Sequence, residues 1–258
     1  MSTVYYFTAI LYTILDITGQ PAFLLKYKIQ DNAPNPPLKK IGRAWLQVLF
    51  NQTVVGITLF ASMFRLIQWR GLVIKPEDLP SFPWVLIELV VCVLAEEVVF
   101  YYSHRMLHHP RIYKYIHKKH HEWVAPIAIT SLYAHPVEHI LSNLLPPFVG
   151  PFLLGSHVAT TWLWYTIAAL STLNAHSGFH FPFFPSPEAH DYHHLKFNQN
   201  YGVLGILDRL HGTDVNFRNS PIYDRHIMLL SLVPLKQLYP DKEKKCVDMG
   251  SGECSKSK

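Results

Sequence analysis

A closely spaced histidine pattern occurs twice in the chain and limits the folds that it can adopt. The sequence H-x-x-H-H is found at 117–121 (HKKHH) and again at 190–194 (HDYHH). Two H-x-x-x-H pairs accompany it, at 104–108 (HRMLH) and 176–180 (HSGFH). In an α-helix, residues three and four positions apart lie on the same face. We therefore predict four helical segments that direct their imidazoles toward a common point.

So many imidazoles in one place predict a metal site. A buried polar group without a partner costs about 1–3 kcal/mol, whereas neutral imidazole is a good ligand for transition metals. One ion takes roughly four to six ligands, so the set suits two neighbouring ions. The predicted ligands are His104, His108, His117, His120, His121, His176, His180, His190, His193 and His194.

The identity of the metal is less constrained than its presence. None of the three cysteines lies near the histidine motifs, which argues against the cysteine-rich sites typical of structural zinc. An all-nitrogen dinuclear site with open positions favours redox chemistry on oxygen. The spacing by itself leaves zinc and copper open.

The chain is also rich in apolar segments. Apolar residues make up 49% of it and charged residues 16%, well below the about 25% charged share of ordinary soluble proteins. A membrane-spanning helix needs about 20 mostly apolar residues. The best candidate runs from about 44 to 66, a second from about 84 to 102, and a weaker one from about 4 to 25. A stretch at 139–173, broken by Pro and Gly, predicts a re-entrant hairpin or two short helices.

Basic residues predict how these segments are oriented. Five Lys and Arg residues lie between 26 and 43, and five between 105 and 119, whereas the loop between the two best spans holds three. Cytosolic flanks carry the excess of positive charge. We therefore expect the two spans to form a hairpin, with every histidine motif on the cytosolic side.

These features together predict an all-α integral membrane protein with a cytosolic, histidine-rich di-metal helical domain. Residues 1–83 are expected to hold N-terminal membrane segments and loops, and 84–215 the catalytic domain. Residues 216–258 form a C-terminal segment, whose polar end from about 241 is predicted to be disordered. The net charge is +5, but the basic residues form no stripe with regularly interleaved aromatic residues, as a nucleic-acid-binding surface would. No nucleic-acid partner is therefore expected.

The motifs resemble those of a known family. HRMLH (104–108), HKKHH (117–121) and HDYHH (190–194) resemble the three histidine boxes of the fatty acid hydroxylase/sterol desaturase superfamily. NAHSGFH (174–180) resembles the additional histidine pair of its hydroxylases. LYAHPVEH (132–139) and NYGVLGILDRLHGT (200–213) resemble further family signatures. The resemblance covers about residues 96–213 and is nearest to the C4-methylsterol oxidases.

The resemblance implies a non-haem di-iron monooxygenase of the endoplasmic reticulum membrane. Such an enzyme would take electrons from NAD(P)H, through cytochrome b5 or its reductase, and use O2 to oxidise a C–H bond of a membrane lipid. A sterol C4-methyl group, in sterol biosynthesis, is the first expectation for the substrate, and a fatty acyl lipid or sphingolipid is the alternative. A catalytically reduced regulatory homologue is a further alternative. A metal transporter is disfavoured, because the histidines stand beside Arg, Lys and Tyr at the membrane edge.

Five further residues are candidates for orienting the metal ligands: Glu97, His135, Asp191, Asp208 and His211. Glu97 is seven residues before His104, on the same face of an unbroken helix, so its carboxylate could accept the second N–H of a ligating imidazole. Asp191 adjoins a predicted ligand and is a candidate for the same role. His135 stands in the H-P-x-E signature, and Asp208 and His211 stand in DRLHGT, so the resemblance places them beside the site.

Overall fold

The computed structural model describes residues 2–71 and 73–240. The end of the chain predicted to be disordered, from about 241, lies outside the described residues. The described residues form helices joined by loops, with no β-strand, which confirms the all-α prediction. The α-helices are α1 (Ser2–Thr18), α2 (Leu38–Phe50), α3 (Gly56–Arg70), α4 (Phe82–Leu107), α5 (Pro110–Tyr113), α6 (Pro136–Glu138), α7 (Leu145–Leu154), α8 (Val158–Ala175), α9 (Glu188–Lys196), α10 (Ile206–His211), α11 (Val215–Arg218) and α12 (Leu235–Leu238).

Short 3₁₀ and π-helical segments connect these helices. The 3₁₀ segments are η1 (Ala22–Tyr27), η3 (Pro76–Asp78), η4 (His117–Glu122), η5 (Ala128–Leu132) and η7 (Pro221–Arg225). The π-helical segments are η2 (Asn51–Val55) and η6 (His139–Leu144). Proline and glycine set several boundaries: Pro110 follows the end of α4, and α3 and α7 are followed by Gly71 and Gly155, both with positive φ.

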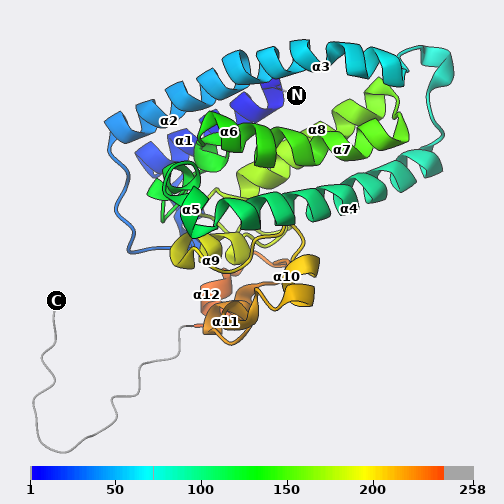
Figure 1. Ribbon diagram of the computed structural model, residues 1–258. Helices are drawn as coiled ribbons and strands as arrows, with labels where there is room; N and C mark the ends of the chain where they lie inside the picture. Colours follow the sequence, from blue (N-terminus) through cyan, green and yellow to red (C-terminus); the bar gives the residue numbers. More distant parts are fainter. Residues whose placement is uncertain (1, 72, 241–258) are drawn as a thin grey trace, which may run out of the picture.

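One continuous helix can cross a membrane. α2, η2 and α3 together form Leu38–Arg70, whose 33 residues are long and apolar enough by length and composition. This helix contains the best span expected from the sequence, and no other helix of residues 2–71 and 73–240 meets the same description. The expected second arm of the hairpin, α4, is 26 residues long, but Glu88, Glu96 and Glu97 interrupt its apolar stretch. Figure 1 shows the long helix on one side of the bundle and α4 on the other, with α7 and α8 between them.

The stretch broken by Pro and Gly folds as the helical hairpin α7–α8, in agreement with one of the two expected forms. α7 packs closely on α4, because Gly150 lies against Cys92. A Cβ added at Gly150 would come within 2.7 Å of the Cys92 Cα. The absence of a side chain at position 150 therefore sets how near these two helices approach.

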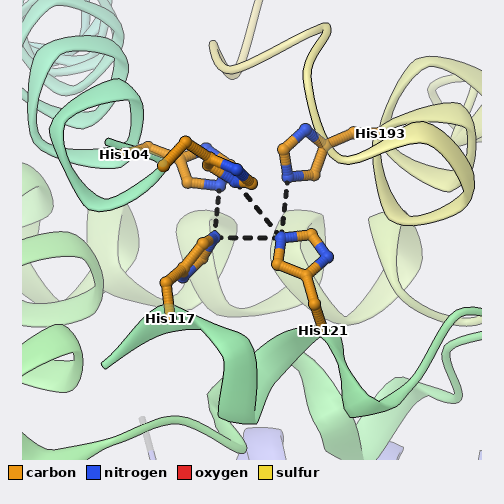
Figure 2. Close-up of side chains that lie close together, drawn as sticks. His104, His117, His121 and His193 are labelled. Atoms are coloured by element: carbon orange, nitrogen blue, oxygen red, sulfur yellow. Dashed lines mark hydrogen bonds between the residues drawn. The ribbon is translucent and has the colours of Figure 1, made fainter. Parts of the chain in front are cut away.

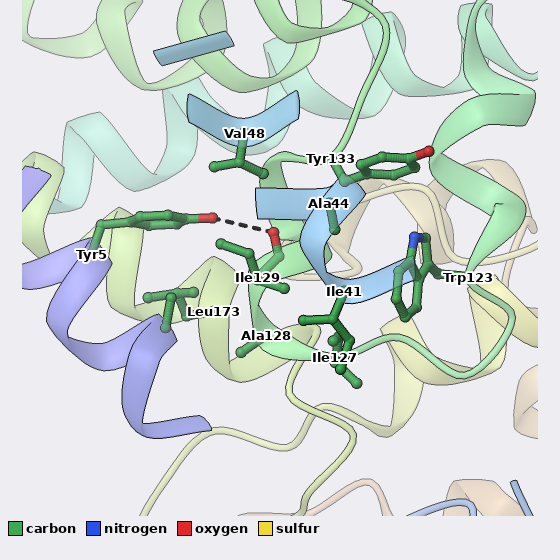
Figure 3. Packing of buried hydrophobic residues seen from close by; sticks show 11 residues of the cluster. Tyr5, Ile41, Ala44, Val48, Trp123, Ile127, Ala128, Ile129, Tyr133 and Leu173 are labelled. Atoms are coloured by element: carbon green, nitrogen blue, oxygen red, sulfur yellow. Dashed lines mark hydrogen bonds between the residues drawn. The ribbon is translucent and has the colours of Figure 1, made fainter. Parts of the chain in front are cut away.

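A buried apolar core joins the N-terminal helices to the loop that follows η4 (Figure 3). Tyr5 of α1 is 2% exposed, and its hydroxyl lies 3.1 Å from Ser131 Oγ and 3.4 Å from the Ile129 carbonyl oxygen. Asn51, in the π-helical turn of the long helix, donates to the carbonyls of Leu132 and Ala134 at 3.1 and 3.0 Å. The core thus attaches the membrane helix to the segment that carries the first H-x-x-H-H motif.

The outward faces of the long helices are apolar and exposed. Large side chains such as Phe7 on α1, Leu46 on α2, Ile57 on α3 and Val90 on α4 are 59–70% exposed. Soluble monomers rarely present apolar surface on this scale. The fold is therefore that of an all-α membrane protein, as the sequence predicted. α9 to α12 gather beyond α4, away from the long helix (Figure 1).

Candidate metal centre

Nine of the ten predicted histidine ligands converge on one region. They form two clusters, within each of which the possible ligand nitrogens lie within 4.8 Å of one another. The first cluster consists of His104, His108, His117, His121 and His193, and the second of His120, His176, His190 and His194. Each H-x-x-H-H motif contributes to both clusters. Rings from both motifs therefore meet in each cluster.

Local structure explains how each segment presents its rings. His104 and His108 lie one turn apart at the end of α4, and the second H-x-x-H-H motif lies on α9. The first motif forms the 3₁₀ segment η4 rather than the expected α-helix. Its three rings still reach the centre because a single tight turn separates positions i, i+3 and i+4. His176 is the residue that follows α8.

The rings of the first cluster meet through their Nε2 atoms (Figure 2). His117 Nε2 lies 3.1 Å from His104 Nε2 and 3.0 Å from His121 Nε2. His121 Nε2 also lies 3.2 Å from the Nε2 atoms of His108 and His193. Four of these rings are buried, and His108 is partly exposed.

The second cluster repeats this arrangement. His176 Nε2 lies 3.3 Å from His120 Nε2 and 2.8 Å from His190 Nε2, and His190 Nε2 lies 3.2 Å from His194 Nε2. The two clusters adjoin, since the ring centroids of His121 and His194 are 4.9 Å apart. Two neighbouring ions are therefore compatible with the arrangement.

Backbone carbonyls hold the outer nitrogens of many of these rings. In the first cluster, Nδ1 of His104 and of His193 lies 2.8 and 2.6 Å from the carbonyl oxygens of Tyr201 and Gln199. In the second cluster, the Nδ1 atoms of His120, His176 and His194 meet carbonyl oxygens of Tyr133, Thr172 and Trp123 at 3.1, 2.9 and 2.9 Å. A carbonyl only accepts, so each of these Nδ1 atoms carries the proton.

This tautomer has a direct consequence for the centre. A neutral imidazole protonated at Nδ1 has a lone pair at Nε2. His120 and His176 thus present two lone pairs to each other at 3.3 Å, and neither ring can donate. A cation between them turns this repulsion into coordination, and ligands bound at about 2.0–2.1 Å from one ion lie ~3–4 Å apart. The donor set therefore fits transition-metal ions, which neutral imidazole binds well.

Burial favours the neutral form that a ligand requires. The pKa of His120 is lowered to about 4, chiefly because burial disfavours the charged ring. The pKa values of His193 and His194 lie well below the ordinary value for the same reason, and repulsion from neighbouring imidazoles lowers them further. These rings are uncharged at neutral pH and available to a metal.

His180 is the predicted ligand that the structure does not bring into either cluster. Its Nδ1 lies 3.3 Å from Glu188 Oε1, and its Nε2 lies 3.0 Å from the Ile227 carbonyl oxygen. The expectation that His176 and His180 share one helical face fails because α8 ends at Ala175 and Gly178 has a φ of +74°. The chain turns between the two histidines, and their rings separate.

Glu97 and Asp208 act on the centre through a loop rather than through a ligand's ring. Glu97 accepts the backbone N–H groups of Val203, Leu204 and Leu207 at 2.8, 2.7 and 3.0 Å, so the expected contact with an imidazole is replaced by contacts with this loop. Asp208 accepts the backbone N–H of Tyr201 at 2.8 Å. The two carboxylates thereby fix the loop whose Tyr201 carbonyl orients His104.

The other three candidates for orienting ligands have different contacts. Asp191 accepts from Gln30 Nε2 at 3.0 and 3.1 Å, and burial raises its pKa to about 7. His135 caps α6, where its Nδ1 accepts the Val137 N–H at 3.2 Å. His211 stacks on Tyr101 with centroids 5.2 Å apart, and its Nε2 lies 3.1 Å from the Tyr102 hydroxyl. None of the three hydrogen-bonds to or stacks on a ring of either cluster.

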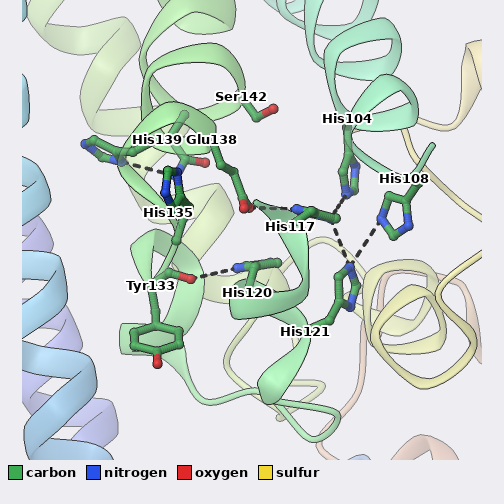
Figure 4. Close-up of polar contacts among 12 residues, drawn as sticks. His104, His108, His117, His120, His121, Tyr133, His135, Glu138, His139 and Ser142 are labelled. Carbon is green, nitrogen blue, oxygen red and sulfur yellow. Dashed lines mark hydrogen bonds and ion pairs between the residues drawn. The ribbon is translucent and has the colours of Figure 1, made fainter. Parts of the chain in front are cut away.

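The sequence interpretation missed the carboxylate that does contact a clustered ring. Glu138, which is 3% exposed, places Oε1 2.9 Å from His117 Nδ1 (Figure 4). It is the acid of the H-P-x-E signature at 135–138, where only the histidine was singled out. An acid within a histidine-containing motif was the available signal, because ligating histidines commonly donate their second N–H to a carboxylate.

Similarity to known proteins agrees with the all-α membrane bundle and its two adjoining histidine clusters. The chain belongs to the fatty acid hydroxylase family, whose family model matches residues 89–213, and members of this family are oxidoreductases. The resemblance seen in the histidine motifs is thereby confirmed.

Individual relatives extend this similarity over most of the chain. It is 50% identical over 234 residues to Fatty acid hydroxylase domain-containing protein 2 of Homo sapiens, a match that covers 90% of this chain and 70% of the relative. It is 41% identical to Fatty acid hydroxylase ahd1 of Mycosarcoma maydis, over 81% of this chain and 54% of that protein. It is 34% identical to Methylsterol monooxygenase 1 of Rattus norvegicus, over 76% and 69%. No solved structure matches the chain.

Proposed function

We propose that the protein is a non-haem di-iron monooxygenase that uses O2 to oxidise a C–H bond of a membrane lipid. The observation that carries the proposal is the pair of adjoining, all-histidine clusters, several of whose inward nitrogens hold unshared lone pairs. Nitrogen-rich sites of this kind suit redox-active iron better than structural zinc. Similarity to a methylsterol monooxygenase and to fatty acid hydroxylases supports the same class of reaction.

The histidine clusters would hold the irons, and neighbouring residues of this chain orient and cover their rings. The first cluster would hold one iron and the second cluster the other, and bound iron would supply the activation of O2. The Tyr201, Gln199, Tyr133 and Trp123 carbonyls keep the protons of their histidines on Nδ1. Aromatic rings cover the cluster: Phe100 packs on His104 and Phe197 on His121, each with centroids 4.9 Å apart. These rings shield part of the first cluster from water, and its edge at His108 stays partly exposed.

We propose a sterol C4-methyl group as the site of oxidation. The 34% identity to Methylsterol monooxygenase 1 over 76% of this chain supports this substrate. The 41% identity to Fatty acid hydroxylase ahd1 supports a fatty acyl or sphingolipid substrate as the second candidate. Insertion of one oxygen atom into C–H consumes O2, two electrons and two protons and yields C–OH and water.

We further propose that the electrons come from NAD(P)H through cytochrome b5 or its reductase, at the endoplasmic reticulum membrane. The basic residues at 26–43, around the start of Leu38–Arg70, and at 105–119, around the end of α4, support a cytosolic position for the histidine clusters. A cytosolic centre is accessible to soluble nicotinamide cofactors and to membrane-anchored donors of that compartment.

Metal analysis of the purified protein tests the centre directly. We expect two irons per chain in the wild type and a lower iron content in His193→Ala. His109→Ala is the matched control, because His109 adjoins His108 in sequence but is exposed and belongs to neither cluster. A wild-type protein that holds no transition metal after supply of iron would contradict the proposal.

Lipid profiling tests the substrate. In cells that lack the protein, accumulation of 4-methylsterols that is reversed by the wild type and not by His193→Ala would support sterol oxidation. Loss of 2-hydroxyacyl lipids with the same pattern of rescue would support the second candidate. Unchanged sterols and hydroxylated lipids, in cells shown to express the protein, would count against both.

A further inference from the structure

An open cavity lies directly against the first cluster. Its volume is about 620 Å³, within the range of about 300–1,000 Å³ typical of sites for small organic ligands. The second cavity, about 30 Å³, has room for little more than a water molecule. The larger cavity therefore has room for part of a lipid molecule beside the first cluster.

The inner wall of this cavity belongs to the metal centre. His108 lines it, and its Nε2 lies 3.2 Å from His121 Nε2. Tyr201 also lines it, with its ring centroid 5.1 Å from that of His108. His108 lies beside His104 and His121 in Figure 4 and is the partly exposed member of its cluster. A molecule in the cavity would thus reach the first cluster at His108.

The outer wall combines apolar side chains with one cationic group. Met106 and Ile112 supply apolar surface, and Arg105 supplies a guanidinium. Arg105 is exposed and donates from Nη1 to the Tyr101 hydroxyl at 3.0 Å. Within residues 2–71 and 73–240, no carboxylate forms an ion pair with Arg105. A guanidinium has five N–H donors, so Arg105 retains donors for a ligand.

Arg105 and His108 are close enough to engage the same small part of one molecule. His108 follows α4 directly, three residues after Arg105, and positions so spaced are neighbours on a helix surface, with Cβ atoms about 5–6 Å apart. A polar group bound by Arg105 and a carbon held beside His108 would therefore belong to neighbouring parts of one molecule in the cavity. The remaining apolar part of the lipid would extend along Met106 and Ile112.

We propose that Arg105 binds the oxygen-bearing head group of the lipid substrate, so that the oxidised C–H lies next to that group. This inference rests on the proposed function and narrows its substrate class. A 4-methylsterol carries a hydroxyl on the ring carbon next to C4, and a fatty acyl chain oxidised at carbon 2 carries its carboxyl carbon next to the reacting position. Both satisfy the geometry, whereas a C–H in the middle of a long chain does not.

Equilibrium binding tests the inference without turnover. Iron-loaded protein in lipid nanodiscs, kept free of reductant, is titrated with two pairs of probes: a 4,4-dimethylsterol and its 3-deoxy analogue, and a saturated fatty acid and the alkane of equal length. Hydrogen bonds to a charged group predict a preference of roughly 10- to 100-fold for the oxygen-bearing member of the accepted pair. We expect Arg105→Met to abolish that preference and Arg105→Lys to retain part of it.

Arg111→Met is the matched control, because Arg111 is an exposed arginine on the neighbouring α5 that does not line the cavity. It should bind both probe pairs like the wild type. Iron content and melting temperature of Arg105→Met should equal those of the wild type, which separates head-group binding from a folding defect. If Arg105→Met fails to fold, Arg105→Lys and Arg105→Gln provide the comparison.

Each outcome has a definite meaning. Loss of preference within the sterol pair supports a sterol head group, and loss within the fatty acid pair supports an acyl head group. An unchanged preference in Arg105→Met, or equal weakening of both members of the accepted pair, would overturn the inference. Absence of lipid oxidation by the wild type would instead overturn the proposed function, so the two failures are distinguishable.

Discussion

Glu138 Oε1 lies 2.9 Å from His117 Nδ1, and both side chains are almost fully buried, with 4% and 2% exposure. Burial raises the pKa of Glu138 well above its ordinary value and lowers that of His117 well below its own. Without a metal, these shifts favour an uncharged pair. A cation at His117 Nε2 requires the proton on Nδ1. The Glu138 carboxylate is then placed to accept a hydrogen bond from this N–H.

Removal of Glu138 should therefore weaken metal binding without removing a ligand. We expect Glu138→Ala to lower the affinity of the first cluster about 10- to 100-fold, the range typical for carboxylates that support ligating histidines. The metal affinity of Glu138→Gln should lie between those of the wild type and Glu138→Ala, because its amide oxygen still accepts a hydrogen bond. Competition with a chelator measures the change. Glu77→Gln, at an exposed acid before α4, is the control, and equal affinities in all variants would contradict the role of Glu138.

The two clusters should hold their ions separately. We expect His121→Ala and His194→Ala each to retain one iron per chain after dialysis, because each removes a ring from a different cluster. The double variant should retain none. His180→Ala should retain two irons, since the Glu188 and Ile227 contacts keep His180 out of both clusters. A loss of iron in His180→Ala equal to that in His194→Ala would show that His180 is a ligand after all.

Glu97 should matter for stability before it matters for metal binding. Its carboxylate satisfies three backbone N–H groups of residues 203–207, where a loop leads into α10. Glu97→Ala would leave these donors without a partner and should lower the free energy of unfolding by about 2–4 kcal/mol. Thermal or denaturant unfolding measures this loss. Glu96→Ala, on the adjacent position of α4, should change stability less, and the reverse order would count against the anchoring role.

The stability of the metal-free protein should fall as the medium becomes acidic. Burial lowers the pKa of His120 to about 4 and depresses those of His193 and His194 strongly. Between the ordinary histidine pKa of about 6.5 and these folded values, the unfolded chain binds more protons than the folded chain. Stability is thus fully present above pH ~6.5 and declines below it.

Unfolding of the metal-free protein at several pH values from about 7.5 to 5 checks this dependence. Bound iron should reduce this loss of stability near neutral pH. A metal bound at Nε2 competes with protons and stabilises the folded state by mass action. A melting temperature that stays constant down to pH 5 in the metal-free protein would contradict the expectation.

Much of the candidate site could be predicted because its chemistry is local in sequence. The i, i+3, i+4 spacing places His190, His193 and His194 on one side of α9, and a single 3₁₀ turn does the same for the first motif. The prediction failed at His180 because spacing implies a shared face only where the helix continues. α8 ends at Ala175 and the chain turns at Gly178, and a single sequence does not reveal which of several glycines adopts a positive φ.

Carboxylate partners were the least predictable part of the site. Glu97 lies on the helical face expected from its spacing to His104, yet it binds a loop more than 100 residues away in the chain. Glu138 reaches His117 across 21 residues and several turns. Such pairings depend on how loops close over the bundle, and hydrophobic or histidine periodicity carries no information about that closure.

The sequence by itself determined that the chain is helical, apolar enough to lie in a membrane, and equipped with histidines in the number and spacing of a two-metal centre, because these properties follow from composition and local periodicity. Only the tertiary structure decided which rings share a cluster, which carbonyls set their tautomers, which acid supports His117 and which cation faces the open cavity. Those relationships join residues distant in the chain, and they are fixed by packing of α4, α8, α9 and η4 around one buried point.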